Sequence, residues 1–318
     1  MEKLQIHLDN SSAAYFPGRT VTGKITFNTH KPLSFSIDAR ILGEAVTYWK
    51  HWNTTFREHI QFTSKNDHLD ELTQLQKNEL VAPGEHTLNF SFQIPQECPP
   101  SFEGKFGSIR YKIHVDFSRS DKKKIESEQA ISVMPYLNLN SIPRALLPFE
   151  DRKSTFPRNE EIEVNVKIPQ RGYIAGETIP IEMSIRNETR TKTLPISIKL
   201  IQVTHFEAQQ RSGHIFKENL KFHRNAIEDN ISEVKKDIKM NSTCENLNFE
   251  LLILESTRSS FKTKLIQLAY KLLISVGKDK SLDFELPIII GTVSVQPEPP
   301  SYKRAMERSE DCPPNYNE

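Results

Sequence analysis

The stretch Tyr15-Phe16-Pro17-Gly18-Arg19-Thr20-Val21 has a second copy in the chain, Tyr173-Ile174-Ala175-Gly176-Glu177-Thr178-Ile179. The copies share the pattern Tyr-x-x-Gly-x-Thr, and apolar residues alternate with other residues before and after each copy. A period of two predicts strands with one buried face, and the Pro-Gly and Ala-Gly pairs predict turns, because glycine adopts positive φ without steric cost. Each copy is therefore predicted to form a strand, a turn and a strand, and the copies are spaced like whole domains rather than solenoid repeats.

The rest of both halves has the same strand-like pattern. Alternating apolar residues cover 88–94 and 109–117 in the first half, and 196–203, 265–276 and 282–295 in the second. Many short strands separated by turn residues predict an all-β chain of two immunoglobulin-like β-sandwich lobes. We expect a first sandwich over 1–136, a proline-rich linker over 137–157, a second sandwich over 158–296 and a flexible tail over 297–318.

Two stretches depart from this pattern. Residues 67–80 place Leu69, Leu72, Leu75 and Leu80 at roughly helical spacing, and we expect either a short helix or a loop there. Residues 207–246 are polar and weakly patterned, which predicts strands with a long surface loop.

The composition narrows the class of function. The 318 residues are enough for two domains, and 42 Lys and Arg against 41 Asp and Glu give no support for nucleic-acid binding. The start of the chain has no apolar run, so we expect no signal peptide and a cytosolic compartment. Cys98, Cys244 and Cys312 are scattered, which predicts neither a disulfide framework nor a zinc site.

No constellation of residues predicts catalysis. His51 and His59 flank Trp52 without a glutamate or cysteine at ligand spacing, so we interpret them as solvated histidines. Neither a Gly-x-Ser-x-Gly elbow nor a phosphate-binding glycine loop is present in the sequence. We therefore expect a non-enzymatic protein with no cofactor and no metal.

The last twenty residues contain the pattern Pro-Pro-x-Tyr twice. It occurs as Pro299-Pro300-Ser301-Tyr302 and as Pro313-Pro314-Asn315-Tyr316. Two adjacent prolines favour an extended polyproline II segment, which docks into an aromatic-lined groove at a reduced entropic cost. The pattern is that of a WW-domain ligand, and the predicted contact residues are Pro299, Pro300, Tyr302, Pro313, Pro314 and Tyr316.

Two further groups have both a structural and a functional interpretation. Lys122, Lys123 and Lys124 lie between two predicted strands, where they form either a solvated hairpin tip or a weak contact with anionic lipid. Trp49 and Trp52 are either exposed cargo contacts or packed residues, and packing is expected for at least one of them.

Further motifs resemble those of the arrestin-domain family, in particular the α-arrestins. The first half is similar to the arrestin N-lobe, and the second half, with the tail, is similar to the C-lobe and to the Pro-Pro-x-Tyr ending of α-arrestins. The resemblance covers about residues 1–296 and depends on these segments: Pro17-Gly18, Ile41-Leu42-Gly43-Glu44-Ala45, Pro83-Gly84-Glu85-His86, Pro100-Ser101-Phe102-Glu103-Gly104, Gly107-Ser108-Ile109-Arg110-Tyr111, Gly172-Tyr173-Ile174-Ala175-Gly176-Glu177, Leu268-Ala269-Tyr270-Lys271-Leu272 and Leu286-Pro287-Ile288-Ile289-Ile290-Gly291-Thr292.

The resemblance implies two sandwich lobes and an adaptor role. α-Arrestins link membrane-protein cargo to the WW domains of HECT-type ubiquitin ligases, which implies roles in ubiquitination, endocytosis and protein transport. It also implies a cytoplasmic protein at the periphery of the plasma membrane and endosomes. Residues 252–257 lack the proline-rich turn usual in the family, and the short tail places Pro299 close to the folded body.

Two alternatives come from other functional classes. A retromer-like endosomal coat or sorting subunit would share the arrestin lobes but would not need tandem Pro-Pro-x-Tyr motifs. A hydrolase built on a β-sandwich ranks last, because no nucleophile–base pair is recognisable in the sequence.

Overall fold

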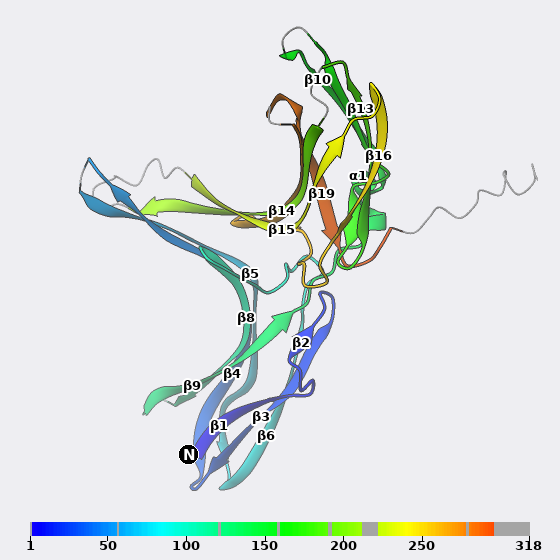
Figure 1. Cartoon of the computed structure of the whole chain (residues 1–318). Helices are drawn as coiled ribbons and strands as arrows, with labels where there is room; N and C mark the ends of the chain where they lie inside the picture. The colour runs from blue at the N-terminus through cyan, green and yellow to red at the C-terminus, as the bar shows by residue number, and fades with distance from the viewer. Residues whose placement is uncertain are drawn as a thin grey trace, which may run out of the picture.

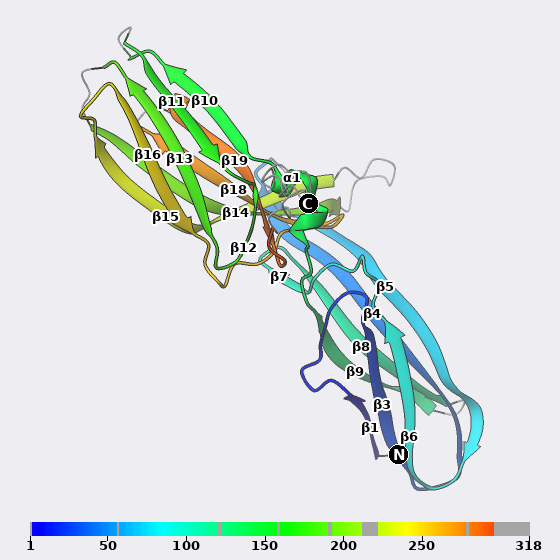
Figure 2. The same cartoon turned by 90° about the vertical axis from the view of Figure 1, so that its right-hand side faces the viewer.

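The computed structural model describes residues 2–55, 57–119, 122–157, 160–189, 193–211, 222–277 and 280–295. These residues are almost entirely strands, arranged as two β-sandwich lobes in an elongated body (Figures 1 and 2). The predicted all-β fold with twin sandwiches is confirmed. None of the helices in the described ranges has the length and apolar character that a membrane crossing requires.

The first lobe packs two sheets face to face. One sheet consists of β1 (Glu2–Leu8), β3 (Thr20–Thr29) and β6 (Gly84–Gln93) in the order β1-β3-β6. The other contains β4 (Leu33–Asn53), β5 (Glu58–Val81), β8 (Gly107–Arg119) and β9 (Lys122–Val133), with the short strands β2 (Ala14–Tyr15) and β7 (Phe102–Gly104) at its margins.

The second lobe repeats this plan. One sheet has the order β10-β11-β13-β16, made of β10 (Phe149–Thr155), β11 (Ile162–Ile168), β13 (Thr178–Asn187) and β16 (Cys244–Leu252). The other contains β12 (Gly172–Ile174), β14 (Thr193–Arg211), β15 (Phe222–Lys239), β17 (Phe261–Lys262), β18 (Ile266–Val276) and β19 (Asp283–Gly291).

The predicted alternation decides which face of each strand is buried. In β3, Val21, Ile25 and Phe27 point into the core, and in β13 Ile179, Ile181 and Ile185 do the same. Each sheet buries its apolar face against the other sheet and exposes its polar face to solvent. The removal of this apolar surface from water is the main contribution to the packing of the two sheets. The repeated turns also match, because Gly18 and Gly176 both have positive φ, at 79° and 88°.

The interpretation of 67–80 as a helix or loop is wrong. These residues belong to β5, which pairs antiparallel with β4 from Glu58 to Val81. Leu69 is buried, whereas Leu72 and Leu80 are largely exposed, so the leucines do not form one helical face. The long β4 supplies the backbone partners, and this tertiary pairing outweighs the local spacing of leucines.

The connection between the lobes is shorter than the expected linker over 137–157. It contains a 3₁₀ turn, η1 (Leu139–Ser141), and a single helical turn, α1 (Pro143–Leu146). Phe149–Thr155 then form β10, which pairs along its whole length with β11 and so belongs to the second lobe. In the second lobe, another 3₁₀ turn, η3 (Lys280–Leu282), precedes β19.

Candidate functional site

The two lobes are joined by a shared sheet. The end of β14 pairs antiparallel with β5, so that Gln209, Gln210 and Arg211 lie opposite Thr63, Phe62 and Gln61. The buried Thr47 hydroxyl donates to the Glu207 carbonyl at 2.7 Å. Because a sheet of one lobe continues into a sheet of the other, the hairpins β4–β5 and β14–β15 extend to the same side of the body (Figure 1).

The first of these hairpins has one packed tryptophan and one exposed tryptophan. Trp49 is 7% exposed and stacks on Phe62, its cross-strand neighbour, with ring centroids 5.4 Å apart. Trp52 is 48% exposed and makes an edge contact with His59, at 4.9 Å between centroids. The expectation that at least one tryptophan packs is therefore confirmed, and Trp52 remains available at the surface.

Trp52 shares its surface with an aromatic residue that the sequence interpretation missed. Tyr48 lies four residues before Trp52 in β4 and is also about half exposed. Residues at even spacing along a strand point to the same side, so Tyr48 and Trp52 face outward together while Trp49 faces inward. The strict alternation through β4 was the signal that distinguishes the two tryptophans. We call Tyr48, Trp52 and His59 the hairpin surface.

A second contact between the lobes joins Arg258 of the second lobe to β7 of the first. The Arg258 guanidinium donates from Nη1 to the Glu103 carbonyl at 3.0 Å and lies over the Phe102 ring, 5.2 Å from its centroid. Phe102 also contacts Phe261 of the second lobe edge to face. Hydrogen bonds from Arg110 hold the pKa of the Glu103 carboxyl below its usual range, so Glu103 stays charged beside Arg258.

A cavity of about 410 Å³ opens beside Arg258 between the two lobes. Pro100, Phe102 and Pro135 form its wall on one side, and Phe261 and Thr292 lie on the other. The wall is mostly apolar with a few hydroxyl groups and one guanidinium, which is the usual character of a site for an apolar side chain or a short peptide.

The lysine run lies at the start of β9, as the hairpin interpretation expected. The structure describes Lys124 but not the side chains of Lys122 and Lys123, so their contact with lipid stays a prediction. The Lys124 ammonium forms an ion pair with Asp116 at 2.7 Å. Lys124 is thus partly neutralised by its own lobe, which weakens its share of any attraction to an anionic surface.

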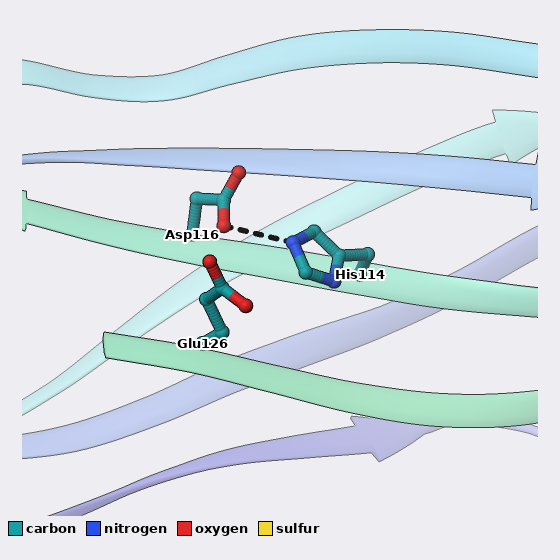
Figure 3. Close-up of side chains that lie close together, drawn as sticks. All are labelled: His114, Asp116 and Glu126. Carbon is teal, nitrogen blue, oxygen red and sulfur yellow. Dashed lines mark hydrogen bonds and ion pairs between the residues drawn. The ribbon is translucent and has the colours of Figure 1, made fainter. Parts of the chain in front are cut away.

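Asp116 belongs to a cluster that contains metal-ligating types of side chain. His114 Nε2 lies 2.8 Å from Asp116 Oδ1, and Glu126 approaches from the neighbouring strand (Figure 3). Burial alone would raise the pKa of Asp116, but hydrogen bonds from Lys124 and His114 outweigh it and lower the pKa. Because Lys124 already occupies the space between Asp116 and Glu126, this is an ion-pair network and we assign no metal to it.

Other residues singled out in the sequence are placed separately. His51 is exposed at the tip of β4, apart from the His114 cluster. Cys98 is buried and Cys244 is exposed, on different lobes. Cys312 and both Pro-Pro-x-Tyr motifs, with Pro299, Pro300, Tyr302, Pro313, Pro314 and Tyr316, lie outside the described residues.

Comparison with known proteins agrees with the architecture. Residues 4–140 match the family model of the arrestin (or S-antigen) N-terminal domain, and residues 158–295 match that of the C-terminal domain. The chain is 26% identical to arrestin domain-containing protein 17 of Caenorhabditis elegans over 92% of its own length and 71% of that protein. It is 24% identical to mouse arrestin domain-containing protein 4 over 90% of the chain and 70% of the relative.

The match to another relative covers less. Human arrestin domain-containing protein 1 is 27% identical over 66% of this chain, and the match spans 49% of that protein. Two family models together account for nearly all of the described body, in the order and at the positions of its two lobes. The chain belongs to the arrestin-domain family, with the α-arrestins.

Proposed function

We propose that this protein is a non-enzymatic trafficking adaptor, which links membrane-protein cargo to WW domains of HECT-type ubiquitin ligases. The observation that carries the proposal is the sequence order: an arrestin C-terminal domain ending at residue 295 is followed at Pro299 by the first of two Pro-Pro-x-Tyr motifs. In this arrangement the tail recruits the ligase and the lobes hold the cargo, so that ubiquitin transfer promotes endocytosis and transport. The expected location is the cytoplasmic periphery of the plasma membrane and endosomes.

The tail supplies weak but additive binding. A single proline-rich motif makes few contacts, so we expect a dissociation constant of micromolar to tens of micromolar, or about −7 to −8 kcal/mol. Two motifs that engage tandem WW domains raise the apparent affinity about 100-fold, because the second binding event is intramolecular. The separation of the motifs therefore favours a partner with more than one WW domain.

The hairpin surface is the best-supported cargo contact on the body. Its exposed rings, Tyr48 and Trp52, are amphipathic and large, and such rings concentrate binding energy at protein interfaces. The surface also lies where both lobes extend to the same side, so a bound cargo segment has access to the β14–β15 hairpin through Phe222, which is also about half exposed.

The decisive experiment removes both terminal tyrosines. Capture by immobilised WW domains from a HECT-type ligase should be lost in the Tyr302→Ala, Tyr316→Ala double variant, because each tyrosine fills a pocket next to the proline groove. Trp52→Ala serves as the control, since it should leave WW capture unchanged while weakening association with cargo. Undiminished capture of the double variant would exclude the tail as the ligase contact.

A further inference from the structure

The chain is held against the body up to the point where the tail starts. Asn138 and Val293 form a parallel bridge, and the Leu137 amide donates to Thr292 Oγ1 at 2.8 Å. The Asn140 side-chain amide then donates to the Ser294 carbonyl, also at 2.8 Å. The exit point of the tail is therefore fixed beside the segment that connects the lobes.

Exposed apolar side chains lie on the segments next to this exit point. Tyr136 is 61% exposed and directly precedes Leu137, which contacts Thr292. Leu139, three residues after Tyr136, is in contrast fully buried against Gly291. We call the following exposed residues the exit patch: Phe16, Met134, Tyr136, Leu146 and Leu147.

The exit patch contains residues of the first lobe, Phe16 and Met134, and residues at the end of α1, Leu146 and Leu147. The Met134 amide donates to the Tyr15 carbonyl at 2.7 Å, which places Met134 beside the turn that carries Phe16. Leu146 ends α1, and the described chain ends close to α1 in both views (Figures 1 and 2). The inter-lobe cavity adjoins the exit patch, because Pro135 and Thr292 line it.

The length of the tail determines which motif can share a partner with the exit patch. Tyr302 follows Ser294 by eight residues, which span about 25 Å in a polyproline II conformation. A folded module of roughly 40 residues has a radius of gyration of about 9 Å, so a module bound at the first motif lies within reach of the body. Tyr316 follows Ser294 by 22 residues, which leaves the second motif free of that restriction.

We infer that the exit patch is a secondary docking surface for the WW domain bound at Pro299-Pro300-Ser301-Tyr302, and that the second motif has no such support. The inference rests on the proposed function, because it takes the WW domain as the partner. The composition of the connecting segment agrees with a protein partner rather than a lipid surface, since Arg144 is the only charged residue from 134 to 147.

The test compares the two motifs within the same protein. One full-length variant, Tyr316→Ala, retains only the first motif, and another, Tyr302→Ala, retains only the second. Each is titrated with a single isolated WW domain of a HECT-type ligase in a calorimeter, beside a synthetic peptide that carries the same motif. We expect the first-motif protein to bind about five- to tenfold more tightly than its peptide, and the second-motif protein to equal its peptide.

Surface variants then locate the additional contact. In the first-motif protein, Tyr136→Ala and Leu147→Ser should each return the affinity towards that of the peptide. Phe156→Ala is the matched control, because Phe156 is equally exposed but follows the far end of β10, and it should change nothing.

Three results would overturn the inference. Equal affinity of protein and peptide at the first motif would show that the exit patch makes no contact with the WW domain. Weaker binding of the protein would show that the body or the tail itself covers the motif. If neither peptide binds the WW domain, the proposed function is refuted together with the inference. The first two results, in contrast, refute the inference alone.

Discussion

The two lobes share a hydrogen-bond framework, and they differ in what they attach to it. Gly18 N–H donates to the Ile94 carbonyl at 2.8 Å, and Gly176 N–H donates to the Ile253 carbonyl at 3.0 Å. The Val133 amide donates to Ser101 Oγ in the first lobe, as the Ile290 amide donates to Ser260 Oγ in the second. These matched contacts lie 157 to 159 residues apart in the chain, so the same hydrogen-bond framework occurs once in each sandwich.

A pair of tyrosines shows where the lobes diverge. The Tyr111 hydroxyl donates to the Pro99 carbonyl at 2.7 Å, and the Tyr270 hydroxyl donates to the Arg258 carbonyl, also at 2.7 Å. The same position therefore carries a proline in one lobe and an arginine in the other. In both lobes the backbone carbonyl at this position accepts a hydrogen bond from a tyrosine hydroxyl. The Arg258 side chain, in addition, extends across to the first lobe. The comparison teaches that the shared framework stabilises each sandwich and that its variable side chains join the two.

Replacing the tyrosines by phenylalanine should have the largest effect, and the effect should differ between lobes. Tyr111→Phe leaves the Pro99 carbonyl buried without a partner, which costs about 2 kcal/mol of unfolding free energy. Tyr270→Phe should cost about 1 kcal/mol, because the hydrogen bonds of its hydroxyl to Arg258 and Gln202 are only partly buried and water can replace them. Denaturant titration measures both variants, and equal losses would show that the two frameworks are buried alike.

Arg258→Ala tests the contact between the lobes and should have an intermediate effect. It removes the hydrogen bond to Glu103 and the contact with the Phe102 ring, at a cost of about 1 kcal/mol. Hydrogen exchange should rise in β7 and leave β3 and β13 unchanged, since neither lobe loses part of its core. Arg258→Lys is the control, because it keeps the charge but not the planar donor. Faster exchange throughout one sandwich would contradict this assignment.

Acid should produce the smallest effect, and Asp116 should account for part of it in the first lobe. The lowered pKa of Asp116 means that its ion pair contributes stability above the ordinary value of 3.8, and that this is lost as the pH falls through the lower folded value. The matched position in β18 is Ser275, which does not titrate. Lobe-resolved hydrogen exchange between pH 3 and pH 6 should therefore show a component that Asp116→Asn removes. Persistence of that component in the variant would assign it to other carboxylates.

The strands and the repeated turn were predictable because their signal is local. Alternation through β3 and β13 specifies a buried face whatever the rest of the chain does. Where the alternation of β14 breaks after Leu200, the register with β15 shifts between Leu200 and Ile201. The same rule separates Trp49 from Trp52, once the register of β4 is followed to its end.

Contacts between distant segments had no comparable signal. Nothing in residues 61–63 indicates that they pair with 209–211, and nothing near Leu69 indicates that β4 will hold the segment as a strand. The cavity beside Arg258 depends on how the two lobes meet, which the sequence of neither lobe encodes alone. Local patterns thus predicted the elements, whereas the junction and its candidate surfaces required the assembled tertiary structure.

The bridge between Asn138 and Val293 has a mechanical consequence. In the function that we propose, tension between a ligase on the tail and a membrane-bound cargo would enter the body at the strip where both lobes are tied together. The load is thereby divided between the two sandwiches instead of peeling β19 from its own sheet. The protein can then transmit a pull without losing the fold of either half.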